Sequence, residues 1–429
     1  MAGVYMGPVA QVYGEVTVPG DKSISHRAAL FGGMAKGETR ISNYLLGQDC
    51  LSTLDCLSKL GVNWVRENGE ILIHGTGMEK WQEPADILNV GNSGTSIRLL
   101  LGAVAGLPLS ATFTGDESIR RRPMRRVTAP LREMGAAIQG RQEGNLAPLT
   151  IQGGNLTGRD FIIPVASAQV KTALLLAGLN AKGSTSVNEP SISRDHTERM
   201  LQAFGVKVER AGSQVRVWGG STLTGQRVAV PGDISSAAFF LVLGSLAAKG
   251  KIVLPQVGIN PTRTGIIDVL RAMGAQIEIK DEQTVCGEPQ ATLIVSPATL
   301  KGVEIGGEMI PRLIDEIPVL ALAACLAEGE TVIKDAGELR VKESDRLHAV
   351  AEGLKNLGGQ IEELPDGLRI MGQRTLKGGS GNSFGDHRLA MTWGIAGLLS
   401  EEGVSITGMD ASEVSYPNFC ADIERCTKK

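Results

Sequence analysis

Six stretches of almost wholly apolar, Ala- and Leu-rich sequence recur along the 429 residues of this chain. Each follows a turn or capping residue, has the pattern of a helix, and passes through a glycine into a short Thr- and Val-rich strand. A helix that is apolar on every side must be buried on every side. The chain therefore has to enclose six interior helices in strands, which predicts a repeat architecture of the α/β class. The repeats start near Lys22, Ser93, Ala168, Ile234, Asp315 and His387.

The elements of each repeat can be placed from local signals. The interior helices are expected over residues 24–34, 95–105, 170–179, 235–247, 317–327 and 389–399. A second helix closes every copy but the sixth and ends at a glycine, as in Leu60-Gly61-Val62 and Met134-Gly135-Ala136. Glycine at this position is typical of a helix end that turns back into a strand.

A boundary sequence occurs twice. Val16-Thr-Val-Pro19-Gly20-Asp21 is echoed almost letter for letter by Val228-Ala-Val-Pro231-Gly232-Asp233. Six buried helices cannot line one ordinary sheet, so two groups of three are the natural packing. We therefore predict duplicated halves joined near Pro19 and Pro231.

Composition excludes several classes of protein. The net charge is −3, so bulk attraction to nucleic acid or to an anionic membrane is not expected. The longest apolar stretches, at 237–248 and 317–327, are too short or too broken by glycine to span a bilayer. The first residues lack a basic segment followed by an apolar core, so we expect no signal or transit peptide. The cysteines are scattered without metal-ligand spacing, which predicts free thiols in a reducing cytosol: Cys50, Cys56, Cys286, Cys325, Cys420 and Cys426.

Cationic residues gather at the repeat starts. In Gly20-Asp-Lys-Ser-Ile-Ser-His-Arg27, two capping residue types precede an apolar helix, and two cations lie beside its positive end. If the interior helices of both halves start on facing surfaces, their N-termini form one positive cleft. Taken singly, each cluster also fits a solvated face or an ion-paired helix start. The other clusters are Asn92–Thr95 with Arg98, Arg120–Arg126, Ser167 and Gln169 with Lys171, Arg194, Arg340–Arg346 and Asp386–Arg388.

Two acidic residues lie among these cations. Asp315 is flanked by apolar sequence, where a carboxylate is costly unless it is paired or functional. Glu343 lies inside the cluster that runs from Arg340 to Arg346. Asp315 and Glu343 are therefore the available proton carriers for chemistry on a bound anion.

These motifs resemble the signature sequences of the 5-enolpyruvylshikimate-3-phosphate (EPSP) synthase family, in family order and over essentially the whole chain. Ser167-Ala-Gln169 and the sequence from Ser193 to Glu198 resemble its class II branch. The resemblance implies a two-domain enolpyruvyl transferase fold, an inside-out α/β barrel of six βαβαββ-type repeats, three per domain. It implies one domain over residues 20–230 and a discontinuous domain over residues 1–19 and 231–429.

The resemblance also implies roles for individual residues. Lys22, Ser23, Arg27, Ser167, Gln169, Arg194, Asp315 and Lys342 would bind shikimate 3-phosphate. Lys22, Gly94, Arg122, Gln169, Arg346 and Arg388 would bind phosphoenolpyruvate. The catalytic residues would be Asp315, Glu343 and Lys22, in an addition–elimination reaction that needs no cofactor or metal. Where one branch has a lysine near its C-terminus, this chain has Glu413-Val-Ser-Tyr-Pro417, so we assign no contact there.

Further expectations concern partners and inhibition. The resemblance implies a cytoplasmic monomer in chorismate and aromatic amino acid biosynthesis, with no nucleic-acid or membrane partner. Glyphosate resembles phosphoenolpyruvate in this family, and resistant class II members often replace the glycine at Gly94 by alanine. Gly94 therefore predicts sensitivity to glyphosate. Leu99, where other branches have proline, is expected to modify that sensitivity.

Two other hypotheses remain open at this stage. One is the sister enolpyruvyl transferase that acts on UDP-N-acetylglucosamine. It typically has a cysteine near the second repeat's arginine cluster, whereas residues 114–126 contain none, and position 23 is Ser and not Asn. The other is a non-catalytic binder of anionic metabolites, which would leave Asp315 and Glu343 without a role.

Overall fold

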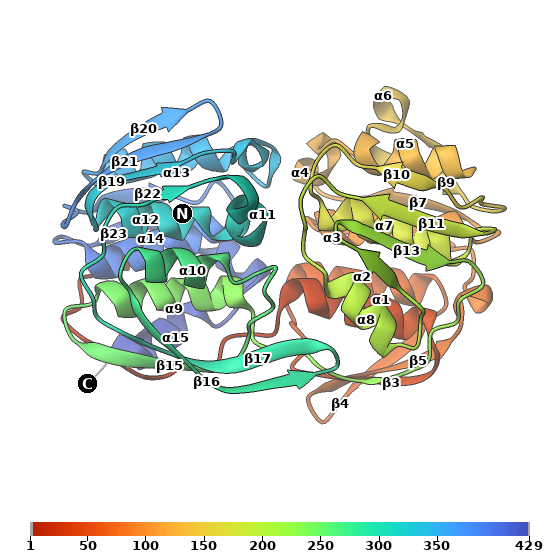
Figure 1. Cartoon of the computed structure of the whole chain (residues 1–429), viewed down its shortest axis with the longest axis horizontal. Coiled ribbons are helices and arrows are strands. Elements are labelled where there is room, and N and C mark those ends of the chain that lie inside the picture. The colour runs from red at the N-terminus through yellow and green to blue at the C-terminus, as the bar shows by residue number, and fades with distance from the viewer. Residues whose placement is uncertain (1–2, 428–429) are drawn as a thin grey trace. The chain divides into compact units, whose positions relative to one another are not determined.

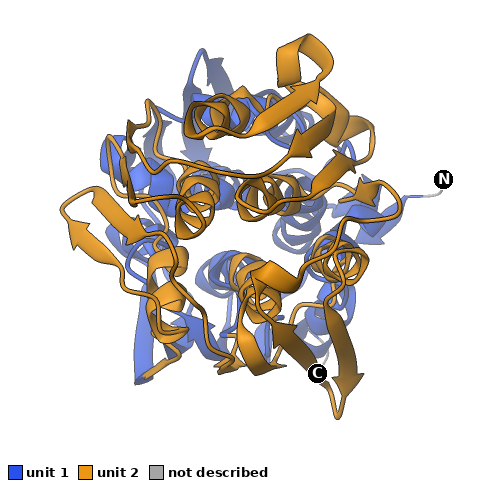
Figure 2. Ribbon diagram, turned by 90° about the vertical axis from the view of Figure 1, so that its right-hand side faces the viewer, with its two compact units in different colours: residues 1–19, 231–283, 289–429 blue, residues 20–230, 284–288 orange. Residues whose placement is uncertain are grey.

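The computed structural model describes residues 3–427 and separates them into two compact units, coloured in Figure 2. Unit 1 contains residues up to 19, 231–283 and from 289 onward, and unit 2 contains residues 20–230 and 284–288. We expected the short segment 284–288 in the C-terminal half. It belongs to unit 2 because the Glu288 carboxylate pairs with His196 at 2.8 Å and the Cys286 thiol donates to the carbonyl of Arg227.

Unit 2 is built from three four-stranded sheets with one shared pattern. In each, a short first strand pairs parallel with the second, which pairs antiparallel with the inner strand of a hairpin. Their strand orders are β14(Arg227–Ala229)-β3(Lys36–Ser42)-β5(Glu70–Thr76)-β4(Asn63–Glu67), β6(Leu88–Asn89)-β7(Ser110–Thr114)-β9(Leu146–Gln152)-β8(Ala137–Gly140) and β10(Asp160–Ile162)-β11(Ser184–Asn188)-β13(Gln214–Trp218)-β12(Glu209–Ala211).

Unit 1 repeats the arrangement, with one strand fewer in its last sheet. Two of its sheets each include one strand from the N-terminus of the chain. In these sheets β2 pairs parallel with β15, and β1 pairs antiparallel with β23. The sheets are β16(Gln276–Val285)-β17(Glu288–Ser296)-β15(Gly250–Gly258)-β2(Val12–Glu15), β18(Glu304–Ile305)-β19(Glu328–Ile333)-β21(Gly367–Gln373)-β20(Gln360–Leu364) and β1(Val4–Met6)-β23(Val404–Thr407)-β22(Gly379–Asn382).

Each sheet is accompanied by one interior helix and further outer helices (Figure 1). The interior helices are α1(Lys22–Met34), α3(Gly94–Ala105), α7(Ala168–Leu179), α9(Ile234–Leu246), α12(Ile317–Cys325) and α14(His387–Leu399). The others are α2(Gln48–Lys59), α4(Glu117–Arg121), α5(Arg125–Met134), α6(Arg141–Gly144), α8(His196–Ala203), α10(Gly265–Ala272), α11(Ile310–Leu313), α13(Arg346–Asn356) and α15(Phe419–Thr427). The prediction of an α/β fold with six repeats, three per unit, is confirmed.

The interior helices are enclosed as their composition requires. In α1 every residue from Ile24 to Met34 is buried, and within unit 1 the helices α9, α12 and α14 pack on one another. Each unit has its own hydrophobic core built around its three interior helices.

Side-chain caps fix where these helices begin. Asp21 accepts a hydrogen bond from the backbone N–H of Ile24 at 2.8 Å, and Ser93 accepts one from Ser96 at 3.0 Å. Ser167, Asp233 and Asp386 cap α7, α9 and α14 in the same way. The start of each of these five helices is therefore fixed by a side-chain cap, beside candidate site residues in α1, α3, α7 and α14.

The glycine steps after the second helices adopt the expected conformation. Gly61 and Gly135 have φ values of 88° and 120°, which residues with a side chain rarely adopt. The same step recurs at Gly205, Gly274 and Gly358. Between residues 3 and 427, no helix has both the length and the hydropathy needed to cross a bilayer.

Candidate active-site residues in the two units

The start of α1 in unit 2 carries two cations that are held in different ways. The Lys22 ammonium lies 3.1 Å from a carboxylate oxygen of Asp49, on the first turn of α2. Arg27, one turn further along α1, donates to the hydroxyls of Thr197 and Thr172 and to the carbonyl of Ser23, at 2.8–2.9 Å. These Arg27 partners are neutral, so they orient its guanidinium without cancelling its charge.

Arg194 lies close enough to Arg27 to affect its ionisation. Burial, above all, lowers the pKa of Arg27 to about 10, and repulsion from Arg194 acts in the same direction. The negative charges of Glu198 and Asp21 oppose this shift and only partly offset it. Two guanidinium groups that repel one another form a natural site for a doubly charged phosphate group.

A second group of residues links the starts of α3 and α7. The Gln169 side chain accepts a hydrogen bond from Arg98 at 2.6 Å and donates one to Thr95 at 2.9 Å. Gly94 lies against two guanidinium groups, because a Cβ atom on it would be 2.9 Å from Nη1 of both Arg98 and Arg122. The glycine thus lets two arginines approach the N-terminus of α3.

Of the five arginines between Arg120 and Arg126, Arg122 is the one that is buried. It follows α4 and donates to the side chains of Asn92 and Ser118 at 3.2 and 3.3 Å. Arg121, its neighbour, forms an ion pair with Glu117 on the helix surface. Arg121 thus fits the interpretation as an ion-paired surface residue, and the buried Arg122 stays a candidate for binding.

In unit 1 the Arg346 guanidinium lies among three carboxylates. Its Nε is 2.7 Å from Asp386, one Nη is 2.7 Å from Glu343, and the other is 3.2 Å from Asp315. Burial by itself would lower the pKa of Arg346, but the three carboxylates outweigh it and raise that pKa above its usual value. The Nζ of Lys342 lies 3.6 Å from Asp315, which makes Lys342 a second cation at this carboxylate.

Asp386 connects this cluster to the start of α14. Its carboxylate accepts a hydrogen bond from the backbone N–H of Arg388 at 2.9 Å and one from the Ser344 hydroxyl at 3.1 Å. The Arg388 guanidinium in turn lies 3.8 Å from Glu316, which follows Asp315 in the sequence. The two arginines expected at a substrate carboxylate are thus tied to the same short segments as the two expected proton carriers.

The predicted site residues therefore fall into one group per unit. Unit 2 contains Lys22, Ser23, Arg27, Gly94, Arg122, Ser167, Gln169 and Arg194, and unit 1 contains Asp315, Lys342, Glu343, Arg346 and Arg388. Sequence reasoning missed Asp49, Thr172 and Thr197, which orient the cations of unit 2. Their signal is weak in sequence, because each pairs with a residue at least 27 positions away. Arg340 is an ordinary ion-paired residue, bound to Asp345 and Glu363 at the surface.

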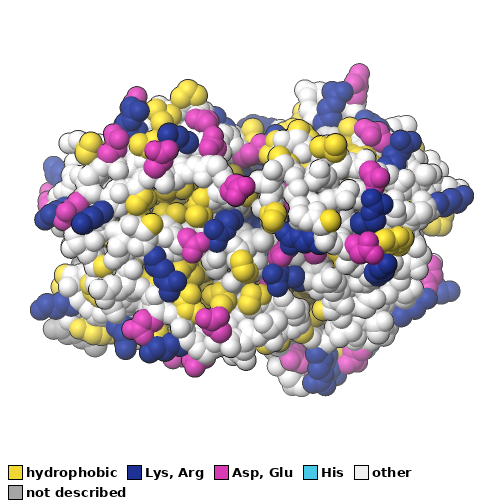
Figure 3. Space-filling model, viewed as in Figure 1, with side chains coloured by type: hydrophobic (Ala, Val, Ile, Leu, Met, Phe, Trp, Pro, Cys, Tyr) yellow, Lys and Arg dark blue, Asp and Glu magenta, His cyan; other side chains and the backbone are white. Residues whose placement is uncertain are grey.

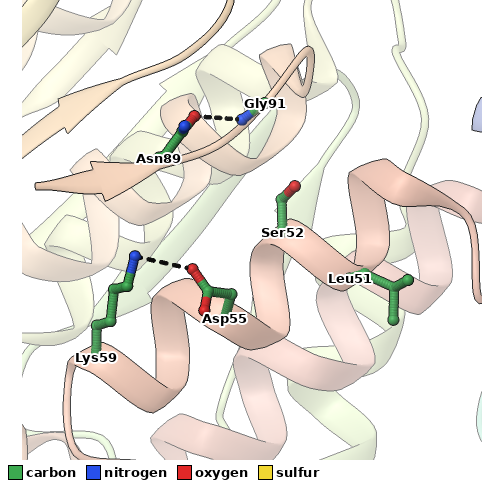
Figure 4. Close-up of a pocket in the computed structure, with 6 residues that line it drawn as sticks. All are labelled: Leu51, Ser52, Asp55, Lys59, Asn89 and Gly91. Carbon is green, nitrogen blue, oxygen red and sulfur yellow. Dashed lines mark hydrogen bonds and ion pairs between the residues drawn. The ribbon is translucent and has the colours of Figure 1, made fainter.

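On the face drawn in Figure 3, cationic and anionic side chains are interspersed. Figure 4 shows a shallow depression of unit 2 beside α2 and β6. Its charged side chains, Lys59 and Asp55, are 3.0 Å apart and neutralise each other, and Asn89 accepts a hydrogen bond from the backbone N–H of Gly91. The six residues that line it are all different from those predicted to bind substrate.

The fold and these two clusters define a repeat-built α/β protein with candidate sites for small, charged ligands. Comparison with known proteins makes the assignment specific. A family model described as EPSP synthase (3-phosphoshikimate 1-carboxyvinyltransferase) matches residues 6–423. The chain belongs to the EPSP synthase family.

Relatives support this over the full length of the chain. A 3-phosphoshikimate 1-carboxyvinyltransferase of Desulfitobacterium hafniense is 64% identical over 97% of this chain and 96% of its own. One of Bacillus subtilis is 53% identical over 98% of this chain and 99% of its own. The solved structure of EPSP synthase from Acinetobacter baumannii matches with a TM-score of 0.88 at 44% identity, covering 99% of this chain and 97% of that one.

The comparisons separate the three hypotheses. The family model is described as EPSP synthase, and the relatives above are named 3-phosphoshikimate 1-carboxyvinyltransferases, which favours the hypothesis based on the sequence motifs. Relatives this similar, named for a catalysed reaction, identify the chain as an enzyme and not as a non-catalytic binder.

Proposed function

We propose that this chain transfers the enolpyruvyl group of phosphoenolpyruvate to the 5-hydroxyl of shikimate 3-phosphate and releases phosphate. This is the reaction of its family, a step of the shikimate pathway toward chorismate and the aromatic amino acids. The observation that carries the proposal is the family match over residues 6–423. We also propose that the chain works in the cytoplasm as a monomer.

Shikimate 3-phosphate is bound mainly by unit 2. Its phosphate is held by Arg27 and Arg194 with the hydroxyls of Ser23 and Ser167, and Gln169 contacts the same substrate. Support comes from the neutral partners of Arg27, which leave its charge for a ligand, and from the repulsion that Arg194 exerts on it. Ser167 adds a helix N-terminus, because it caps α7.

The residues proposed to bind phosphoenolpyruvate are those that the family motifs indicate. Its phosphate contacts Lys22, Gly94, Arg122 and Gln169, and the closeness of Gly94 to the Arg122 guanidinium supports this grouping. Its carboxylate contacts Arg346 and Arg388, whose side chains are both buried and cationic. Because Arg346 already interacts with Asp315 and Glu343, the carboxylate of the substrate shares this guanidinium with both acids.

Asp315 and Glu343 carry the protons. Asp315 accepts the proton of the 5-hydroxyl as that oxygen attacks C2 of phosphoenolpyruvate, while Glu343 delivers a proton to C3, which gives a tetrahedral intermediate. Loss of a proton from C3 and of phosphate from C2 then restores the double bond in the product. Lys342 contacts shikimate 3-phosphate beside Asp315, and Lys22 stabilises charge on the phosphate as the bond to C2 breaks.

Glyphosate is expected to inhibit the enzyme at the phosphoenolpyruvate site. A methyl group at position 94 would displace the guanidinium of Arg98, Arg122 or both, since its carbon would lie 2.9 Å from each. The glycine that this chain has leaves that space to a ligand. Gly94 therefore supports sensitivity, and Leu99, buried on the same helix, is a possible site of modulation.

The assignment is tested with the purified full chain. Phosphate release from phosphoenolpyruvate is measured with shikimate 3-phosphate, with UDP-N-acetylglucosamine, and with neither acceptor. The product is identified from its mass by mass spectrometry. We expect release only with shikimate 3-phosphate, in a one-to-one ratio to the enolpyruvyl product. Release with UDP-N-acetylglucosamine alone, or binding of both substrates without release, would overturn the proposal.

A further inference from the structure

Three buried charges in unit 2 have no role in the reaction described above. Lys171 on α7 is completely buried, and its ammonium lies 2.8 Å from Glu189 and 2.7 Å from Glu198. Both carboxylates are also buried, at 4% exposure each. Removing three ionised groups from water is costly, and apolar residues of similar size often stabilise a core as well or better. Such a cluster calls for a function beyond stability.

The first clue is what Glu189 holds. It follows β11, and its carboxylate accepts hydrogen bonds from both the backbone N–H and the hydroxyl of Ser193. The intervening residues are thereby closed into a loop on this carboxylate, and Arg194 is the next residue. Lys171 thus fixes Glu189, Glu189 fixes Ser193, and Ser193 sets where the chain presents Arg194.

The second clue is what lies beside Glu198 and Lys171. Their sequence neighbours, Thr197 and Thr172, form a hydrogen bond with each other at 2.6 Å. These are the two hydroxyls that accept the hydrogen bonds of Arg27. The ion pair between Lys171 and Glu198 therefore joins α7 to α8 directly beside the pair of threonines that orients Arg27.

The cluster also compensates an unfavourable interaction. The guanidinium groups of Arg27 and Arg194 repel each other, while the negative charge of Glu198 stabilises Arg27 in its charged form. Before a ligand binds, fixed anions behind the two cations are needed to keep them close together. Glu198 supplies one such anion, alongside Asp21 and Glu288, and Lys171 holds Glu198 and Glu189 together without repulsion.

We propose that Lys171, Glu189 and Glu198 are positioning residues that hold Arg27 and Arg194 at the spacing required by the phosphate group of shikimate 3-phosphate. The cluster then determines how strongly the enzyme prefers the phosphorylated acceptor to unphosphorylated shikimate. This inference rests on the proposed function, since it assumes that the two arginines bind that phosphate.

The experiment compares two ligands that differ only in the phosphate group. Dissociation constants for shikimate 3-phosphate and for shikimate are measured by isothermal titration calorimetry on the wild-type chain and on Glu189→Gln. We expect Glu189→Gln to weaken shikimate 3-phosphate about tenfold, the loss of roughly one charge-assisted hydrogen bond, and to leave shikimate within about twofold. In turnover, KM for shikimate 3-phosphate should rise while KM for phosphoenolpyruvate, at saturating acceptor, stays unchanged.

Two further variants keep the test decisive. Lys171→Arg keeps the positive charge and is expected to retain most of the preference, whereas Lys171→Met with Glu189→Gln, which removes one charge of each sign, should lose it. Asp160→Asn is the matched control, because it neutralises an exposed carboxylate of the same unit, whose ion-pair partner is Arg216 at 3.2 Å. Asp160→Asn is expected to bind both ligands like the wild type.

The outcomes are distinguishable. Equal weakening of both ligands in Glu189→Gln would mean that the cluster only supports the fold, and unchanged affinity for both would mean that it positions nothing; either result overturns this inference. If Glu189→Gln does not fold, the same comparison is made with Lys171→Arg and the double variant. A wild-type chain that fails to turn over shikimate 3-phosphate would instead refute the proposed function itself.

Discussion

Arg27 in unit 2 and Arg346 in unit 1 are both buried, at 2% and 1% exposure, yet they have opposite electrostatic surroundings. Arg27 is held by hydroxyls and a carbonyl, and burial together with Arg194 lowers its pKa to about 10. Arg346 is held by three carboxylates, which raise its pKa in spite of burial. Arg27 therefore has charge to offer a ligand, whereas Arg346 serves first to organise the acids around it.

The starts of α1 in unit 2 and α9 in unit 1 have the same cap but differ in the charged residues beside it. Asp21 caps α1 and Asp233 caps α9, each accepting a backbone hydrogen bond of 2.8 Å. The residue after the cap is Lys22 in α1 but Ile234 in α9. At α9 the Ser235 hydroxyl donates to the protein's own carboxylate, Glu316.

The chain also supplies a cation at α9, since Arg263 donates to Ser235 at 2.7 Å. The start of α9 is thus occupied by Arg263 and Glu316, whereas the start of α1 carries Lys22, which is paired with Asp49. The same backbone was adapted to different tasks through a few side chains. We infer that unit 2 mainly binds phosphate and that unit 1 mainly moves protons, and the following variants test this division.

The largest effect is expected for the acids of unit 1. Asp315→Asn and Glu343→Gln should each lower kcat by about 10² to 10⁴, because a proton carrier is lost, while the affinity for shikimate 3-phosphate changes much less. Steady-state phosphate release and calorimetry measure the two quantities. Glu304→Gln, on the surface beside Lys334, is the control and should behave as wild type. Near wild-type kcat in both variants would contradict the assignment of roles.

The next effect should be on binding, in unit 2. Arg27→Met keeps the length of the side chain but removes its charge, so the affinity for shikimate 3-phosphate is expected to fall about 10²-fold by loss of charge-assisted hydrogen bonds. At saturating acceptor, kcat should fall far less than in Asp315→Asn. If Arg27→Met instead lowered kcat with unchanged affinity, the division between the units would be wrong.

A smaller and more local change is expected at Gly94. In Gly94→Ala the added methyl group displaces the Arg98 and Arg122 guanidinium groups, so KM for phosphoenolpyruvate should rise about tenfold. Glyphosate should lose at least as much affinity, while the affinity for shikimate 3-phosphate stays the same. Inhibition constants for glyphosate at fixed acceptor provide the measurement, and equal sensitivity of variant and wild type would remove Gly94 from the site.

The smallest effect concerns stability against pH. Burial, together with the charges of Lys22 and Arg27, holds the pKa of His26 well below its ordinary value of 6.5. As the pH falls through 6.5, the unfolded chain takes up a proton that the folded chain excludes, so the free energy of unfolding decreases. The contribution is at most ~1.4 kcal/mol per pH unit.

Urea unfolding at pH 7.5 and 5.5 compares the wild type with His26→Asn, which replaces the titratable ring beside Thr53 by an uncharged amide. The difference in stability between the two pH values should be smaller in the variant. An equal difference in both proteins would show that His26 does not carry this pH dependence.

Much of the fold was predictable from sequence because its signals are local. Apolar helices, capping residues such as Asp21 and glycine steps such as Gly61 each report on a few neighbouring residues, and six copies repeat them. The repetition of Pro19-Gly20-Asp21 as Pro231-Gly232-Asp233 indicated where the chain passes between its two halves. The exception was the segment 284–288, whose place depends on its contact with His196, far away in sequence.

The site was predictable as a set of residues, but not as a set of interactions. Sequence identified the motifs that bring Lys22, Arg346 and Asp315 to the repeat starts, and through them the family. Only the tertiary structure decided that Lys22 pairs with Asp49, that Arg122 and not Arg121 is buried, and that Lys171 joins Glu189 and Glu198. The physical reason is that local patterns encode helices and turns, whereas the strength of a charge depends on burial and on partners that folding brings together from distant parts of the chain.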